Sequence, residues 1–172
     1  SEGVVSTSGN TIWYVNWKQK QCIRLVSGHL GYVNSIAAIP GNIVSASSDR
    51  TVRFWSQQPE SFEQTLQVQT ANESAEPTCL VIGTYYDKQY CAVGYSDGQL
   101  QIIRLDAINR LTKGLIRNKV KLHPEPVSCI SICGKRIFCG GANGSVTLIH
   151  FNGQSPPYEE NAECTVHRLI QL

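Results

Sequence analysis

Residues 28–56 read GHLGYVNSIAAIPGNIVSASSDRTVRFWS, and this stretch decides the fold. Polar and apolar residues alternate from Tyr32 to Ile39, and a Pro40-Gly41 turn follows. Two further short runs are separated by an Asp49-Arg50 turn. Alternation of this period, with tight turns between the runs, is typical of short antiparallel strands. The stretch therefore predicts three consecutive strands of one sheet.

Four polar side chains occupy the ends and turns of these strands. They are His29 before the first strand, Ser45 in the second, Asp49 in the turn and Trp55 at the end of the third. A buried imidazole needs an acceptor, a turn carboxylate needs donors and an indole N–H needs a partner. We therefore expect a buried hydrogen-bond network, in which either Ser45 or Ser47 supplies the hydroxyl.

The spacing from Gly28-His29 to the tryptophan resembles a WD repeat, the repeating unit of a family of β-propellers. Asp97 and Asn143 follow Asp49 in register, at intervals close to the ~40 to 45 residues expected of one blade. His123 takes the place of His29 in the last of these repeats. We expect Asp97, His123 and Asn143 to belong to weaker copies of the same network. The resemblance implies an all-β fold of four-stranded blades.

The strand pattern divides the chain into four segments: 1–27, 28–76, 77–122 and 123–172. The first is a partial blade of three outer strands, the second carries the full motif, and the last two are degenerate blades. We predict an incomplete propeller of about three and three-quarter blades of a larger ring. The remaining blades are expected in a longer protein of which this chain is a part.

Composition argues against several classes of function. The chain has 15 Lys and Arg residues against 13 Asp and Glu residues, so its charge gives no argument for binding nucleic acid or an anionic membrane. No apolar run is long enough to span a membrane, and no signal-peptide pattern opens the chain. We expect a cytoplasmic protein without a cofactor.

Two sets of residues suggest chemistry at first sight. The first, His29, Ser45 and Asp49, has the composition of a hydrolase triad. A triad needs an exposed serine beside an oxyanion hole, and no GxSxG motif occurs here. We therefore expect a structural network and no enzyme.

The second set suggests zinc and consists of Cys129, Cys133, Cys139, His123 and His150. Structural zinc sites usually place closely spaced cysteine pairs on turns, whereas these cysteines fall within strands. Reduced cysteines buried in apolar strands, Cys91 among them, are the favoured interpretation, and we expect no metal site.

Five residues are candidates for contact with a partner: Lys18, Lys20, Tyr32, Arg50 and Lys113. The lysines fall in turns between third and outer strands and could share one face. A solvated rim of mixed charge is the favoured interpretation of them, because glutamates occupy the corresponding turns of the other blades. Exposed tyrosines are common anchors at interfaces.

Four stretches resemble one subgroup of WD-repeat proteins more closely. They are TIWYVNWKQKQCIRLVSGH at 11–29, AVGYSDGQLQIIRLD at 92–106, LHPEPVS at 122–128 and GGANGSVTLIHF at 140–151. They are similar to large centriolar and ciliary WD-repeat proteins that bind microtubules, relatives of the echinoderm microtubule-associated-protein-like family.

This resemblance implies a non-catalytic interaction scaffold in the cytoskeleton, at a centriole or in the axoneme of a cilium or flagellum. Its implied partners are tubulin or microtubule-associated proteins, and the other blades of its own propeller. The alternative is a substrate- or peptide-recognition propeller of an enzyme complex such as a ubiquitin ligase. A ring of arginines on one face would favour that alternative, but only Arg50 lies near such a rim.

Overall fold

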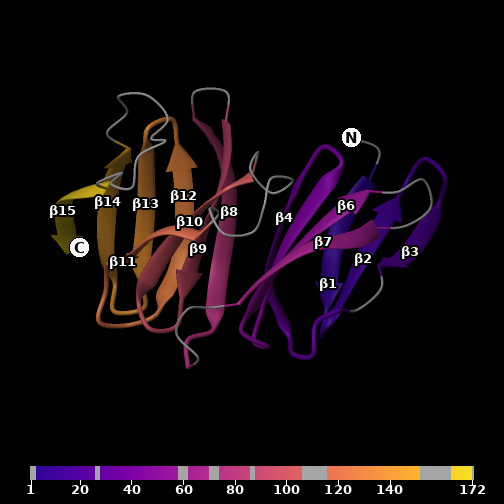
Figure 1. The fold of residues 1–172 in the computed structure, drawn as a ribbon, viewed down its shortest axis with the longest axis horizontal. Coiled ribbons are helices and arrows are strands. Elements are labelled where there is room, and N and C mark those ends of the chain that lie inside the picture. Colours follow the sequence, from indigo (N-terminus) through magenta and orange to yellow (C-terminus); the bar gives the residue numbers. More distant parts are fainter. Residues whose placement is uncertain are drawn as a thin grey trace. The chain divides into compact units, whose positions relative to one another are not determined.

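The structure is a computed structural model that describes residues 3–25, 28–57, 62–69, 74–85, 88–105, 116–151 and 164–171. Within these residues the regular elements are all β-strands, arranged in four antiparallel sheets (Figure 1). Three sheets have four strands and the first has three. This confirms the predicted all-β fold of an incomplete set of propeller blades.

The first sheet contains three strands in the order of the chain: β1 (Gly3–Ser8), β2 (Thr11–Asn16) and β3 (Gln21–Leu25). Along β2, Ile12 and Asn16 are buried and Val15 is exposed, as is Trp17, the residue after the strand. The face of the sheet that carries Ile12 contributes to the core.

The second sheet also follows the order of the chain: β4 (Val33–Ile39), β5 (Asn42–Ser47), β6 (Thr51–Gln57) and β7 (Phe62–Gln69). Gly41 closes the β4–β5 turn with a φ of 77°, which a glycine adopts without strain. The Val33 N–H donates to the Gly9 carbonyl at 2.8 Å and links the first two sheets. A shared core of Ile12, Val33, Ile43 and Trp55 lies between them.

The third and fourth sheets have the same hairpin topology. The third contains β8 (Pro77–Tyr85), β9 (Lys88–Tyr95), β10 (Gln99–Arg104) and β11 (Ile116–Lys121). The fourth contains β12 (Val127–Cys133), β13 (Arg136–Gly141), β14 (Ser145–Phe151) and β15 (Cys164–Gln171). Leu122 N–H and His123 N–H both donate to the Gly98 carbonyl, at 3.0 and 3.2 Å. This link also joins one sheet to the turn of the sheet before it, but its donors lie ahead of β12, whereas Val33 is the first residue of β4.

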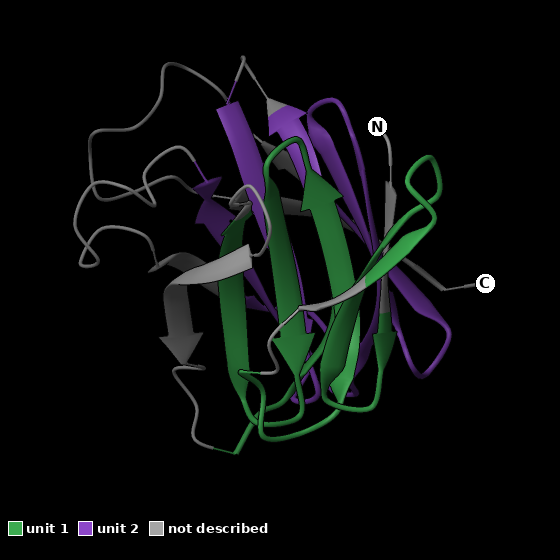
Figure 2. Ribbon diagram, turned by 90° about the vertical axis from the view of Figure 1, so that its right-hand side faces the viewer, with its two compact units in different colours: residues 1–80 green, residues 81–172 purple. Residues whose placement is uncertain are grey.

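The chain divides into two compact units, residues 1–80 and 81–172 (Figure 2). The four sheets span residues 3–25, 33–69, 77–121 and 127–171, so each falls inside one of the four predicted segments. The boundary between the units falls within β8, after Leu80. Among the described residues, no helix has the length and apolar character needed to cross a membrane.

The predicted burial of the cysteines is wrong for two of the four. Cys91 and Cys139 are buried, but Cys129 and Cys133 are exposed. Both exposed thiols lie on β12, an edge strand of its sheet. Ile130 and Ile132 are half-buried and occupy the alternate positions, so the cysteines face the solvent side.

Candidate functional site

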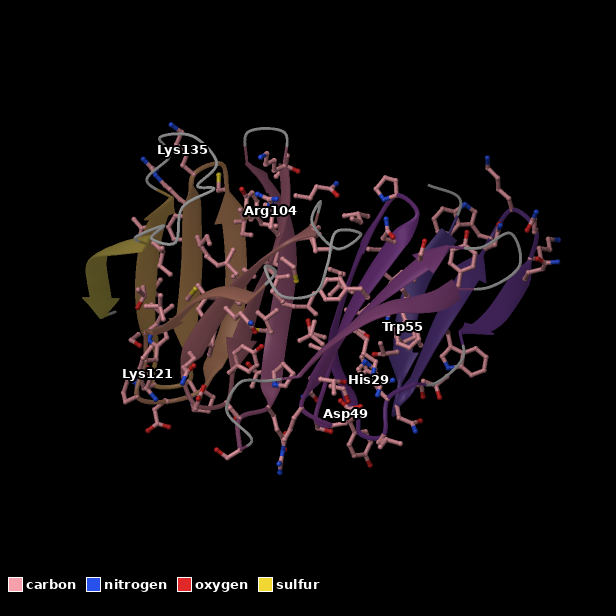
Figure 3. All side chains as sticks on the ribbon, in the orientation of Figure 1. His29, Asp49, Trp55, Arg104, Lys121 and Lys135 are labelled. Atoms are coloured by element: carbon pink, nitrogen blue, oxygen red, sulfur yellow. The ribbon has the colours of Figure 1, made fainter. Side chains whose placement is uncertain are left out.

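The four predicted network residues converge in the second sheet. His29 precedes β4, Ser45 lies on β5, Asp49 lies in the β5–β6 turn and Trp55 lies on β6. Figure 3 shows His29 beside Asp49 at one end of the sheet, with Trp55 further along the strands. The loop passes close over the turn, because a Cβ added at Gly31 would lie 2.8 Å from the Asp49 nitrogen. Only glycine fits this approach.

One chain of hydrogen bonds connects the indole to the carboxylate. The Trp55 Nε1–H donates to Ser45 Oγ at 2.8 Å, and Ser45 Oγ lies 2.7 Å from His29 Nε2. On the other side of the ring, His29 Nδ1 lies 2.9 Å from Asp49 Oδ2. A neutral imidazole with its proton on Nδ1 gives every donor in this chain one acceptor. Ser45, and not Ser47, therefore supplies the hydroxyl between His29 and Trp55.

The Asp49 carboxylate also accepts hydrogen bonds from its own turn and from the loop. The Thr51 N–H and hydroxyl donate to Oδ1 at 3.0 and 2.6 Å, and the Leu30 N–H donates to Oδ2 at 2.9 Å. Burial by itself raises the pKa of Asp49, but the hydrogen bonds from Thr51, His29 and Leu30 outweigh it and lower the pKa to about 2. Burial lowers the pKa of His29 below its ordinary value, against the opposing effect of Asp49. The pair is therefore a carboxylate beside a neutral imidazole.

This arrangement can hold a loop, and it is poorly suited to nucleophilic catalysis. Ser45 is fully buried, and both His29 and Trp55 already bond to its hydroxyl oxygen. A catalytic serine needs a hydroxyl that a substrate can reach. Among the described residues, no group of three or more His, Cys, Asp or Glu side chains is placed to hold a metal ion.

The fourth sheet contains part of the same network. His123 Nδ1 lies 2.8 Å from Ser145 Oγ, and the Ser145 hydroxyl donates to Asn143 Oδ1 at 2.6 Å. The other ring nitrogen, His123 Nε2, is buried and has no hydrogen-bond partner. Cys139 and Ile149 take the places of Ser45 and Trp55 there. In the third sheet, Asp97 Oδ1 accepts the corresponding turn bond from the Gln99 N–H, at 3.1 Å.

Sequence reasoning missed three contributors to the network: Thr51, Arg53 and the backbone of Leu30. Arg53 Nε donates to the Thr51 hydroxyl at 3.2 Å, and its Nη2 lies 3.5 Å from Asp49 Oδ2. The sequence contained a signal for Thr51, because both Asp49 and Asn143 are followed two positions later by a hydroxyl residue, Thr51 and Ser145. In an Asx turn, the side chain of an Asp or Asn accepts a hydrogen bond from the residue two positions later.

The structure separates the predicted partner-facing residues into two groups. Tyr32 and Arg50 are exposed at the end of the second sheet that holds His29 and Asp49. Lys18 and Lys20 are also exposed, but they lie in the β2–β3 turn at the opposite end of the strands. Lys113 lies outside the described residues.

Residues 20–56 match the WD40 family, described as WD domain, G-beta repeat. This match covers β3 to β6 and contains the complete network from His29 to Trp55. Together with the repeated four-stranded sheets, it identifies the chain as a WD-repeat protein.

Over most of its length the chain is similar to WD repeat-containing protein 90. It is 31% identical to that protein of Xenopus tropicalis over 160 residues, which are 85% of this chain and 8% of the relative. The Homo sapiens protein is also 31% identical, over 86% of this chain and 8% of the relative. A shorter match of 45 residues, 47% identical, joins 25% of this chain to 8% of Pleiotropic regulator 1 of Homo sapiens. The chain thus spans about 8% of the length of these relatives.

Proposed function

We propose that this chain is part of a non-catalytic protein-interaction scaffold in a microtubule-based assembly of the cytoplasm, at a centriole or in a ciliary or flagellar axoneme. The observation that carries the scaffold role is that His29, Ser45 and Asp49 serve as a structural hydrogen-bond network. Their polar atoms are bonded to one another inside the blade and hold the exposed loop at residues 30–32. A surface held in this way favours binding over chemistry.

The microtubule part of the proposal is supported by the resemblance of residues 11–29, 92–106, 122–128 and 140–151 to microtubule-binding WD-repeat proteins. The exposed lysines of the β2–β3 turn, Lys18 and Lys20, agree with it, because cations favour contact with an acidic partner. The alternative role, peptide recognition through a ring of arginines, has less support. Glycines 98 and 144 stand where the second sheet has Arg50.

Co-sedimentation of the full chain with stabilised microtubules tests the proposal. We expect the chain to pellet with microtubules at low salt and to be released progressively as salt is raised, because screening weakens contacts between exposed charges. The double variant Lys18→Glu with Lys20→Glu should bind microtubules less tightly. Its matched control is Lys135→Glu, at an exposed turn of the other unit, and the affinity of this variant should fall less. A chain that stays in the supernatant even at low salt would contradict the microtubule role.

A further inference from the structure

The fourth sheet exposes apolar side chains on one of its faces. Phe138 lies on this face, in the middle of β13, and is 37% exposed. Its cross-strand partners are the exposed Ser131 of β12 and the half-buried Leu148 of β14. Paired residues of neighbouring strands point to the same side of a sheet, so Cys129 and Cys133, two positions on either side of Ser131, also belong to this face. We call this surface the open face of the fourth sheet.

The same positions of the repeat are buried in other sheets. The repeats align on their turn residues, so Phe138 takes the place of Val44 in the second sheet and of Ala92 in the third. Val44 is 1% exposed and Ala92 is fully buried. Leu148 likewise takes the place of Phe54 in the second sheet, which is 3% exposed. The open face of the fourth sheet is therefore of a kind that is covered elsewhere in the chain.

The first sheet exposes a face of the opposite kind. Val15 of β2 takes the place of the buried Trp55 of the second sheet, yet Val15 is 36% exposed. Trp13 and Trp17 lie two positions before and after Val15, and they are half-buried and exposed, respectively. Cys22 of β3 is the cross-strand partner of Val15 and is exposed as well. We call this surface the open face of the first sheet.

A contact within the chain shows how these two kinds of face fit together. Ile12 of the first sheet forms a core with Trp55 of the second, and Tyr14 packs against that core. Tyr14 and Leu148 have the same position in the repeat, and so do Trp55 and Val15. A face like the open one of the fourth sheet thus packs on a face like the open one of the first. The chain exposes both halves of a contact that it also makes internally.

We propose that copies of this chain associate head to tail, with the open face of the fourth sheet of one copy packed on the open face of the first sheet of another. Burial of side chains such as Phe138 and Val15 supplies the driving force. The nearly balanced charge of the chain opposes this association little. The two faces differ, so the contact is heterologous. The sequence predicts that a longer protein supplies further blades, and a second copy offers the same kind of surface.

Sedimentation velocity of the full chain over a range of concentrations tests this self-association. The variants Phe138→Asp and Val15→Asp each place a charge on one open face, at a side chain that is already partly exposed. The matched control is Leu30→Asp, which places the same charge at an exposed apolar residue in the loop before β4, outside both faces. Thermal unfolding of each variant shows whether it is folded.

We expect the sedimentation coefficient of the native chain to rise with concentration. Phe138→Asp and Val15→Asp should each weaken self-association by about tenfold or more, because the contact would bury a charge without a partner. Leu30→Asp should leave self-association unchanged. A mixture of Phe138→Asp with Val15→Asp should form heterodimers, because one variant keeps the face of the first sheet and the other keeps the face of the fourth. Mixing would not restore an association through two identical faces.

Three exposed cysteines report on the two faces without any mutation. Cys22 belongs to the open face of the first sheet, and Cys129 and Cys133 belong to that of the fourth. With maleimide in excess, we expect all three thiols of the native chain to be labelled more slowly as the protein concentration rises, because association covers them. In Phe138→Asp the labelling rates should not depend on concentration. Mass spectrometry of the digested chain measures the rate at each cysteine.

A native chain that stays monomeric at every concentration would overturn the proposal and leave both faces to other blades of a longer ring. Equal weakening by Leu30→Asp, or a mixture of the two folded face variants that stays monomeric, would overturn it as well. Slower labelling at Cys129 and Cys133 but not at Cys22 would indicate contact between two fourth sheets and contradict the head-to-tail arrangement. If a face variant fails to fold, labelling of the native chain decides. Microtubule co-sedimentation tests the proposed function separately from these results.

Discussion

The second and fourth sheets contain the same turn with the same hydrogen bonds. In the second, the Thr51 N–H and hydroxyl donate to Asp49 Oδ1 at 3.0 and 2.6 Å. In the fourth, the Ser145 N–H and hydroxyl donate to Asn143 Oδ1 at 3.1 and 2.6 Å. A single oxygen is enough for this turn, so an amide can replace the carboxylate there.

The two sheets differ at the second oxygen of the turn residue. Asp49 Oδ2 accepts from His29 and from the Leu30 N–H. Pro124 takes the place of Leu30 in the fourth sheet, and proline has no N–H to donate. The comparison teaches that the carboxylate is needed only where the loop above the turn must be held. That loop is the one with exposed Leu30 and Tyr32.

Asp49→Ala should have the largest effect on stability. It leaves His29, Thr51 and the Leu30 N–H without their acceptor in a nearly buried site, so we expect a loss of about 3 kcal/mol in the free energy of unfolding. Asn143→Ala, at an exposed position, should cost about 1 kcal/mol or less. Urea unfolding followed by tryptophan fluorescence measures both. Equal losses in the two variants would show that the second oxygen contributes nothing.

Acid should weaken the same network without mutation. Because the pKa of His29 is lowered below 6.5 in the folded chain, the unfolded chain takes up that proton first, and stability falls as the pH drops below 6.5. The pKa of Asp49 is about 2 against an ordinary 3.8, so its contribution is complete above 3.8 and is lost as the pH falls toward 2. Urea unfolding at a series of pH values measures the decline. His29→Gln should remove the loss of stability that begins near pH 6.5. An unchanged dependence of stability on pH in this variant would show that His29 is not the group that titrates there.

Ser45→Ala should have the next largest effect. The Trp55 N–H loses its buried acceptor and His29 Nε2 loses its buried donor, so we expect a loss of about 2 kcal/mol in unfolding free energy. Ser47→Ala is the matched control on the same strand, because Ser47 Oγ accepts only from the Asp49 N–H among the bonds described, at 3.1 Å. If Ser47→Ala costs as much as Ser45→Ala, the central place given to Ser45 is wrong.

Cys139→Ser should act in the opposite direction and by a smaller amount. It places a hydroxyl where Ser45 stands in the second sheet, and His123 Nε2 is a buried acceptor without a partner. We expect a gain of about 1 kcal/mol in unfolding free energy from this added bond. The same substitution at Cys91, which is buried in the third sheet, offers no such imidazole and should be destabilising. A loss of stability in Cys139→Ser would show that the two networks cannot be interchanged.

The sequence predicted most of the fold because its strands are short, alternate clearly and end at Gly, Pro or Asp turns. The first strand of the second sheet, β4, begins one residue after the predicted start at Tyr32 and ends at the predicted Ile39. It also indicated which side chains meet, because His29, Asp49 and Trp55 stand at the ends of adjacent strands. The choice between Ser45 and Ser47 needed the structure, since alternation alone does not say which face of β5 meets the imidazole.

Exposure was the property that the sequence predicted least well. Cys129 and Cys133 sit in an apolar run, but they are exposed because β12 is an edge strand with its isoleucines on the other face. The exposure of Leu30 was equally hidden, because nothing in the alternation of the sequence assigns a residue before a strand to either face. Both depend on neighbouring strands that are distant in sequence, so local patterns do not reveal them.

Arg50→Gly should have the smallest effect on stability, and it isolates backbone strain at the turn. Relief of the left-handed conformation is worth about 1 to 2 kcal/mol, and most of it is offset by the greater freedom of glycine in the unfolded chain. We expect a net gain of about 0.5 kcal/mol in unfolding free energy. The reciprocal variant Gly144→Arg has space for its Cβ, with no atom within 4 Å, so it should lose a similar amount. If Arg50→Gly is destabilising while Gly144→Arg is neutral, then contacts of the Arg50 side chain stabilise the turn by more than the backbone strain costs.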